Sequence, residues 1–513
     1  MNRSRAAIWN YASALLFTAI TLIGLWATKY VLSVLGPERF GASRMLTDWL
    51  GYLSLIELGL TGALSPMLAR DLARQDRERS IATLTVGLQI FLIFGGLTLV
   101  AALAMWLVIG RIIPVDSADI LDLRIAWGIS LVSLLPTAVA PFRSLADAGQ
   151  RGYRINLALA MQSLMIFGLS CGFARLGWGI SGQALATTLA VMPLVIMLTY
   201  EGMRHEKGLL RAALSTRPDW SVGRELISLA VPSFLIGLSG RISVLTDSLV
   251  VGNILGTSLA GSLVLTLKLV VMAQGQLQGI GAAAWAGLAQ LHAKGEREQF
   301  NSRLIELTGL VAMLAVGALG PITAYNSEFM AIWVGTQHDV GPWVVALGAF
   351  NALLLGLFSL WFWCFTGTGQ VARMVPVTVT AAVINLTSSV IATHAFGVIG
   401  PTMGTTISFL SVSLWILPRE LSRTFGTSIR GLFRAWLIPV AYGVPFTVAL
   451  HFLARTHRPW GLIGLGLEMG VAAAIFVGLG GRFLLGPDAR AVWSARLSAA
   501  IPRFRRNGEP PDE

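Results

Sequence analysis

The chain has 513 residues, of which 55% are hydrophobic and 12% are charged, and its formal net charge is +12. Soluble domains contain about 25% charged residues. This composition therefore excludes a soluble globular protein and predicts an integral membrane protein. Cys171 and Cys364 both lie in apolar runs, which offers neither a disulfide framework nor a zinc-ligand spacing.

Runs of about 20 apolar residues predict transmembrane helices. Fourteen such runs follow one another, so we expect an all-α integral membrane protein with about 14 transmembrane helices. The runs are 11–35, 45–69, 81–110, 125–146, 155–174, 177–200, 225–252, 258–289, 303–325, 343–368, 374–396, 399–418, 435–454 and 460–481. The first run is too long for a cleaved signal peptide and lacks a small-residue cleavage site, so we expect it to be retained as a span.

The distribution of basic residues predicts the orientation. With the amino terminus in the cytoplasm, the cytoplasmic segments hold 28 Lys and Arg residues, the external segments hold 7 and the spans hold 3. A cytoplasmic excess in short loops is typical of membrane proteins, and it predicts that both termini are cytoplasmic. The positive net charge is thereby explained by topology and by contact with the inner leaflet. It gives no indication of nucleic-acid binding.

The sequence repeats itself at an offset of 220 residues. The matched positions include Leu35-Gly36 with Leu255-Gly256, Gly41 with Gly261, Gly59 with Gly279, Gly149-Gln150 with Gly369-Gln370, and Gly177 with Gly397. One constant offset over six spans predicts two six-helix repeat lobes. We expect an N-lobe at 1–205, a cytoplasmic linker at 206–224, a C-lobe at 225–425, two further spans at 426–482 and a cytoplasmic tail at 483–513. Parallel repeats are common in transporters, whose substrate site lies between the halves.

Charged residues inside the spans are the candidate functional residues, because a charge at bilayer depth is costly and usually functional. Asp48 and Lys268 occupy the same position of the two repeats, and a pseudo-twofold axis would bring them face to face. Arg241 lies on a polar stripe of the seventh span, and Lys29 lies beside the matching stripe of the first. Stripes of small residues also suit tight helix packing, and buried charges also suit structural ion pairs. Both of these structural roles stay open as alternatives to the hypothesis that the residues line a water-filled cavity between the lobes.

The sequence contains no recognisable catalytic or metal-binding pattern. Its six histidines are scattered without a metal-ligand spacing, and it has no phosphate-binding loop of the Walker type. The predicted external loops are all shorter than 20 residues, too short for the catalytic region of a membrane polymerase or ligase. We therefore expect a protein that is not an enzyme, with no cofactor and no metal.

The segment LGPERFGASRMLTDWLGYLSLIELGLTGALSPMLA, residues 35–69, resembles the amino-terminal signature of polysaccharide-transport flippases, the O-antigen and exopolysaccharide flippases. The matching positions are Leu35-Gly36, Glu38, Phe40-Gly41, Glu57-Leu58-Gly59-Leu60, Ala63 and the nearby Arg70. The resemblance covers nearly the whole chain. It implies the fold of the multidrug/oligosaccharidyl-lipid/polysaccharide exporter superfamily.

This resemblance implies a flippase for polysaccharide biosynthesis in the bacterial cytoplasmic (inner) membrane. Such proteins move an undecaprenyl-pyrophosphate-linked oligosaccharide from the cytoplasmic to the periplasmic leaflet by alternating access. A pyrophosphate needs cations, and Arg binds phosphate through two parallel hydrogen bonds whereas Lys acts as a point charge. Arg241, Lys268 and Lys29 are the expected substrate-binding cations, and Asp48 is the expected partner of a cavity cation. Asp247 and Glu57 are candidates for conformational or ion coupling.

Two transporters of the same fold remain as alternatives. One is a flippase for lipid II, the peptidoglycan precursor; that family carries a cluster of Arg in its first two spans, for which Lys29 and Arg44 are a weak substitute. The other is a multidrug exporter, which usually has twelve spans. A membrane glycosyltransferase is the enzyme alternative, and the short loops count against it. The sequence does not identify the glycan, a coupling ion such as H+ or Na+, the oligomeric state or a contact with polysaccharide polymerase machinery.

Overall fold

The computed structural model of the protein describes residues 3–53, 60, 63–64, 67–68, 70–72, 74–134, 141–142, 152–205, 207–456 and 459–483. All regular structure in these ranges is helical, as the apolar runs predict. The described chain forms two compact units, one made of Met1–Lys268, Met330–Asn351 and Gly369–Ile416, the other of Leu269–Phe329, Ala352–Thr368 and Leu417–Glu513. These units do not follow the expected lobe boundaries, which stay a prediction.

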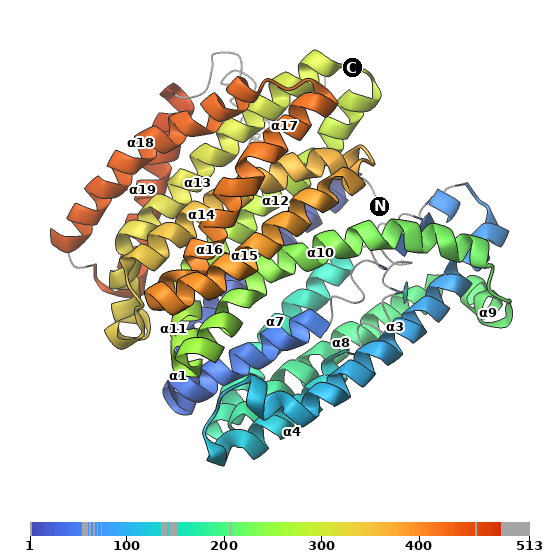
Figure 1. Cartoon of the computed structure of the whole chain (residues 1–513), viewed down its shortest axis with the longest axis horizontal. Helices are drawn as coiled ribbons and strands as arrows, with labels where there is room; N and C mark the ends of the chain where they lie inside the picture. The colour runs from blue at the N-terminus through green and yellow to red at the C-terminus, as the bar shows by residue number, and fades with distance from the viewer. Residues whose placement is uncertain are drawn as a thin grey trace, which may run out of the picture. The chain divides into compact units, whose positions relative to one another are not determined.

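The first unit is built around α1, which packs chiefly against helices that are distant from it in the sequence. Its α-helices are α1 (Arg3–Leu53), α3 (Arg77–Ile112), α4 (Ile120–Ser130), α7 (Gly152–Arg175), α8 (Ile180–His205), α9 (Lys207–Ser215), α10 (Trp220–Leu255), α11 (Thr257–Thr266), α15 (Val375–Phe396) and α16 (Gly400–Ser408). Helix α1 packs against α7, α10 and α11, and Figure 1 shows it beside α7 and α11. A buried Trp127 on α4 donates its indole N–H to the Ala102 carbonyl of α3 at 2.9 Å, which satisfies the one polar atom of that large side chain.

The helices of the second unit pack closely against one another at glycines. The unit contains all of α18 (Ile429–Thr456) and α19 (Gly461–Phe483). Four further helices belong to it in part: α12 (Lys268–Ala293) from Leu269 onward, α13 (Arg297–Trp333) up to Phe329, α14 (Pro342–Gly367) from Ala352 onward and α17 (Leu414–Phe425) from Leu417 onward. Gly317 and Gly320 of α13 face Val477 of α19 and Thr447 of α18, so close that an added Cβ would lie within 3 Å of either side chain. Small residues at such contacts let membrane helices approach each other.

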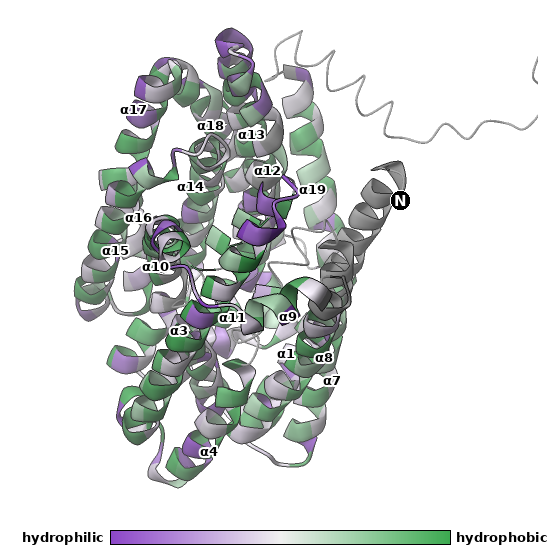
Figure 2. Cartoon of the chain, turned by 90° about the vertical axis from the view of Figure 1, so that its right-hand side faces the viewer, coloured by the Kyte–Doolittle hydropathy of each residue, from purple (hydrophilic) through white to green (hydrophobic). Residues whose placement is uncertain are grey.

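The surfaces of the helices are apolar, which is the pattern expected in lipid. Figure 2 shows hydrophobic residues along the lengths of the helices. On α3, Leu92, Val100 and Leu107 have 73%, 65% and 69% of their surface exposed. Among the described residues, nine helices are long and apolar enough to cross a membrane, or up to ten if one bent pair counts as a span. The expectation of about 14 spans is thereby met in part, since runs 45–69 and 125–146 include residues outside the described ranges.

One of these nine stretches, Val371–Phe425, contains two of the expected spans. Its 55 residues would make a straight helix about 80 Å long, well beyond the roughly 30 Å hydrocarbon core. Gly397 breaks the stretch with a φ of 72°, a conformation that favours glycine. Beyond Gly397 the chain runs back along the preceding helix, since Gly400 lies against Thr393 and Gly404 against Ser389. The stretch is therefore an antiparallel pair of helices.

The repeat offset of 220 residues recurs in the backbone. Positive φ angles occur at Gly36 and Gly256, and again at Gly177 and Gly397. Gln75, with a φ of 56°, corresponds in the same way to Gly295, with a φ of 75°. In addition, the equivalent residues Gly41 of α1 and Gly261 of α11 touch each other within the first unit, because a Cβ built on Gly261 would lie 3.3 Å from the Gly41 Cα. Contact between equivalent residues is the arrangement that a pseudo-twofold axis produces.

Candidate anion-binding site

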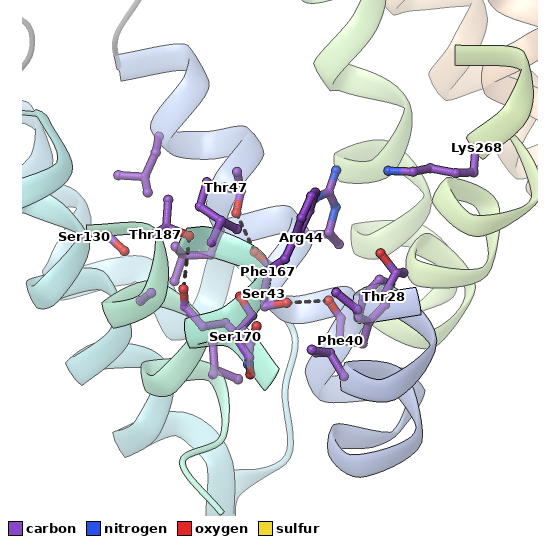
Figure 3. Close-up of a pocket in the computed structure, with 18 residues that line it drawn as sticks. Thr28, Phe40, Ser43, Arg44, Thr47, Ser130, Phe167, Ser170, Thr187 and Lys268 are labelled. Carbon is purple, nitrogen blue, oxygen red and sulfur yellow. Dashed lines mark hydrogen bonds between the residues drawn. The ribbon is translucent and has the colours of Figure 1, made fainter. Parts of the chain in front are cut away.

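A pocket of about 170 Å³ lies in the first unit, among α1, α4, α7 and α8 (Figure 3). Helix α1 reaches it from both sides of its break at Gly36, where φ is 78°. The lining residues are Ala27, Thr28, Val31, Phe40, Ser43, Arg44, Leu46, Thr47, Leu50, Ser130, Ile166, Phe167, Ser170, Ile180, Gln183, Ala184, Thr187 and Lys268. The residues from the second part of α1 recur every three or four positions, which places them on one face of the helix.

Two cations of the pocket point toward one another. Figure 3 shows the side chains of Arg44 and Lys268 extending from opposite sides with their nitrogen atoms facing each other. The Arg44 Nε is buried, and no described group accepts a hydrogen bond from it. Lys268 begins α12, directly after α11 ends with Leu267 as its C-cap. Two like charges in a site with little water repel each other strongly, so an anion between them would lower the energy of both.

The described lining of the pocket carries no carboxylate, although Asp48 lies beside it within range of the Arg44 charge. The buried Nε of Arg44 lacks an acceptor among the described groups, and phosphate oxygens accept hydrogen bonds from both Arg and Lys. The pocket is therefore suited to an anionic ligand.

The remaining polar groups of the pocket are mostly hydroxyls. Ser43 donates to the Phe40 carbonyl at 2.7 Å, and Thr47 donates to the Ser43 carbonyl at 2.9 Å. Thr187 on α8 donates to the Gln183 carbonyl at 3.1 Å. Because these hydrogen atoms are used within the helices, the hydroxyl oxygens retain lone pairs for an outside donor. Such acceptors suit the hydroxyl groups of a sugar.

Of the residues predicted from sequence, Lys268 lines the pocket and Lys29 does not. Lys29 is exposed, and its Nζ donates to the Ile332 carbonyl at 3.1 Å within the first unit. Arg241 lies in α10, and its side chain is outside the described part of the structure. Glu57 also lies outside the described residues.

Asp48 and Asp247 form a second group beside the pocket. Asp48 on α1 accepts a hydrogen bond from the Ser248 hydroxyl on α10. It lies one helical turn after Arg44 and within range of that charge. Asp247 is close enough to Asp48 for the two carboxylates to repel each other. The predicted pairing of Asp48 with Lys268 does not occur in this conformation, since no ion pair among the described residues joins them.

Arg44 is the pocket residue that the sequence analysis missed. The predicted spans 11–35 and 45–69 place Arg44 in the loop between them, whereas it lies on α1 and lines the pocket. One signal could have identified it. Arg44 precedes Asp48 by four residues and follows Gly41 by three, so the three residues share one face of the helix.

No protein-family model matches the sequence. The chain is 22% identical over 480 residues to the uncharacterized membrane protein EpsK of Bacillus subtilis (strain 168), a match that covers 90% of this chain and 92% of EpsK. It is 21% identical over 239 residues to the probable low-salt glycan biosynthesis flippase Agl15 of Haloferax volcanii, about half of each chain, 46% and 49%.

Solved structures define the fold. The lipid II flippase MurJ in an inward closed conformation superimposes with a TM-score of 0.69 at 12% identity, over 92% of this chain and 99% of MurJ. An inward-facing multidrug resistance MATE family transporter of the MOP superfamily gives a TM-score of 0.58 at 18% identity, over 85% of this chain and 98% of the transporter. The protein is thus a multi-pass integral membrane protein with the transporter fold of the MOP superfamily, the exporter superfamily that the sequence resembles. It is distantly related to EpsK and Agl15.

Proposed function

We propose that this protein is a flippase for an undecaprenyl-pyrophosphate-linked oligosaccharide in polysaccharide biosynthesis, and that it works by alternating access. The observation that carries the proposal is the convergence of Arg44 and Lys268 in a pocket whose described lining has no carboxylate. Pyrophosphate is a multiply charged anion, and two cations of different repeats suit its two phosphate groups. The hydroxyl oxygens of the same pocket suit a glycan.

The distant relatives support the same class of substrate. Agl15 is named as a probable glycan biosynthesis flippase, and the structurally similar MurJ is a lipid II flippase. A lipid II flippase is therefore the first alternative, since that substrate also carries a pyrophosphate. A multidrug exporter of the same fold is the second alternative. The cationic pocket disfavours it for positively charged drugs, because Arg44 and Lys268 would repel them.

We further propose that the protein lies in the bacterial cytoplasmic membrane with both termini in the cytoplasm. The 28-to-7 distribution of basic residues supports this orientation. Arg241 remains in the proposal as a third cation for the headgroup, on the strength of its place on the polar stripe of α10. Glu57 remains a coupling candidate on its sequence context alone.

The test is transport of a lipid-linked glycan by the full chain in liposomes. Arg44→Gln and Lys268→Gln should each slow transport about 10- to 100-fold, because each charged hydrogen bond is worth roughly 1.5–3 kcal/mol. Arg124→Gln is the matched control, since Arg124 is exposed and outside the pocket. Undecaprenyl-pyrophosphate oligosaccharide, lipid II and a cationic dye are compared as cargo.

Equal transport by the Gln variants and the control would exclude the pocket as the headgroup site. A wild-type protein that carries lipid II faster than the oligosaccharide would favour the first alternative. Export of the dye without either lipid would favour the second.

A further inference from the structure

The group beside the pocket contains an acid whose partner is missing. The Oδ1 atom of Asp247 is buried, and no described group donates a hydrogen bond to it. The Asp48 carboxylate accepts a hydrogen bond from Ser248, the residue next to Asp247, and its charge acts on Asp247. Two carboxylates this close in a site with little water do not readily both carry a charge, and an orphaned carboxylate oxygen is costly unless something binds it.

The neighbours of the two acids come from α1 and α10. The Ser248 hydroxyl donates to Asp48, and the hydroxyls of Tyr52 and Thr246 hydrogen-bond each other. Tyr52 is within range of both carboxylates. Arg44 is the described cation whose charge acts on Asp48, and its side chain also faces the ammonium of Lys268. The charge of Asp48 is therefore compensated chiefly by Arg44, the same residue that faces the anion pocket.

We propose that Asp48 and Asp247 form a proton-binding carboxyl pair, and that the pair takes up a proton from solvent when an anion occupies the site of Arg44 and Lys268. This inference rests on the anion site of the proposed function. In the empty state Arg44 compensates Asp48. A bound anion competes for the charge of Arg44, so Asp48 loses its counter-charge and a new O–H bond to the pair becomes favourable.

A proton fits this group better than a metal ion does. Hard metal cations take about six oxygen ligands. Here one oxygen of Asp48 already accepts from Ser248, and the hydroxyls of Tyr52 and Thr246 are bonded to each other. The buried Oδ1 of Asp247 is the described oxygen left without a partner. One proton shared between the two carboxyl groups would satisfy it.

The test measures sulfate binding to the purified full chain as a function of pH. Sulfate is a dianion throughout the neutral range, so any proton taken up on binding comes to the protein. Uptake of one proton makes affinity rise about tenfold for each unit by which the pH falls. Asp48→Asn and Asp247→Asn should bind sulfate with a much flatter pH dependence. Glu306→Gln, which removes an acid near Arg303 in the other unit, should keep the wild-type slope.

Lys268 is the competing source of a proton, because its ammonium is largely removed from water and lies within range of the Arg44 charge. Lys268→Arg keeps the positive charge and does not titrate in this range, so it should retain the slope. Loss of the slope in Lys268→Arg, or its persistence in both Asn variants, would overturn the carboxyl pair. Infrared difference spectra provide a direct readout. Adding sulfate should produce the band of a protonated carboxylic acid in the wild type and not in Asp48→Asn or Asp247→Asn.

These outcomes are independent of the transport result. A proton-linked sulfate site in a protein that moves no lipid-linked glycan would leave the carboxyl pair standing and refute the proposed cargo. Glycan transport together with pH-independent sulfate binding would support the proposed cargo and refute the carboxyl pair. Sulfate binding that is unchanged by Arg44→Gln would overturn the anion site and the linkage together.

Discussion

At the scale of single residues, the two lysines that the sequence singles out in different spans have different surroundings. Lys268 lies at the pocket with its nitrogen toward Arg44. Lys29 is exposed and donates to the carbonyl of Ile332. A backbone carbonyl already satisfies part of the Lys29 ammonium, and water reaches the rest, so the residue has no need of a ligand.

Lys29→Gln should therefore transport within about twofold of the wild type, because an exposed contact of this kind is worth at most about 1 kcal/mol. The measurement is the liposome assay at matched protein level, with Lys268→Gln beside it. A loss of transport in Lys29→Gln as large as that in Lys268→Gln would indicate that Lys29 is part of the substrate site.

The same two residues show what sequence can and cannot predict about the site. The cost of a buried charge is visible in the sequence, and it predicted a functional role for Lys268, which lines the pocket in the structure. The direction of its side chain depends on the end of α11 at Leu267, whose φ and ψ are −83° and 3°. No residue in that stretch is a glycine or proline that would announce a break. The neighbour of Lys268 could therefore not be predicted, and in this conformation it is Arg44 and not Asp48.

At the scale of helices, the sequence predicted more of the structure than it did at the scale of single residues. Apolar runs correctly located most of the described helices, and glycines at matched positions marked the turns, because a positive φ restricts the residue choice at those points. Arg44 shows the limit of this approach. A charged residue at the edge of an apolar run was assigned to a loop, although α1 resumes at Pro37, directly after the break, and carries it into the pocket.

The contact of α1 with α11 gives a prediction at this scale. A Cβ on Gly41 would lie 1.8 Å from the Thr257 carbonyl oxygen, far closer than non-bonded atoms can approach. Gly41→Ala therefore forces α1 and α11 apart, and the protein should lose several degrees of thermal stability in detergent. Gly95→Ala on α3 is the control, because no atom lies within 4 Å of its added Cβ. That change should leave stability equal or slightly higher, since alanine favours helix by about 1 kcal/mol. Equal melting of the two variants would contradict the close contact.

At the scale of the whole molecule, the predictions concern topology. Both termini are expected in the cytoplasm, since short loops with many basic residues remain on that side. Reporter fusions at Asp122 and Gly335 should report the periplasm, and fusions at Arg77, Arg211 and Arg430 should report the cytoplasm. A periplasmic signal at Arg211 would place an odd number of spans before it. The two repeats would then have opposite orientations, against the parallel repeat that the offset of 220 predicts.

The contact between Gly41 and Gly261 has a consequence for how such a chain could arise. If each half were a separate polypeptide, two identical copies would meet here through the same glycine, and one codon change would alter both sides of the interface at once. Joining the halves in one gene removes that coupling and lets each side change alone. The present contact is already uneven: a Cβ on Gly41 would meet a carbonyl oxygen at 1.8 Å, whereas one on Gly261 would meet its nearest atom at 3.3 Å. Position 261 should accordingly tolerate substitution more readily than position 41.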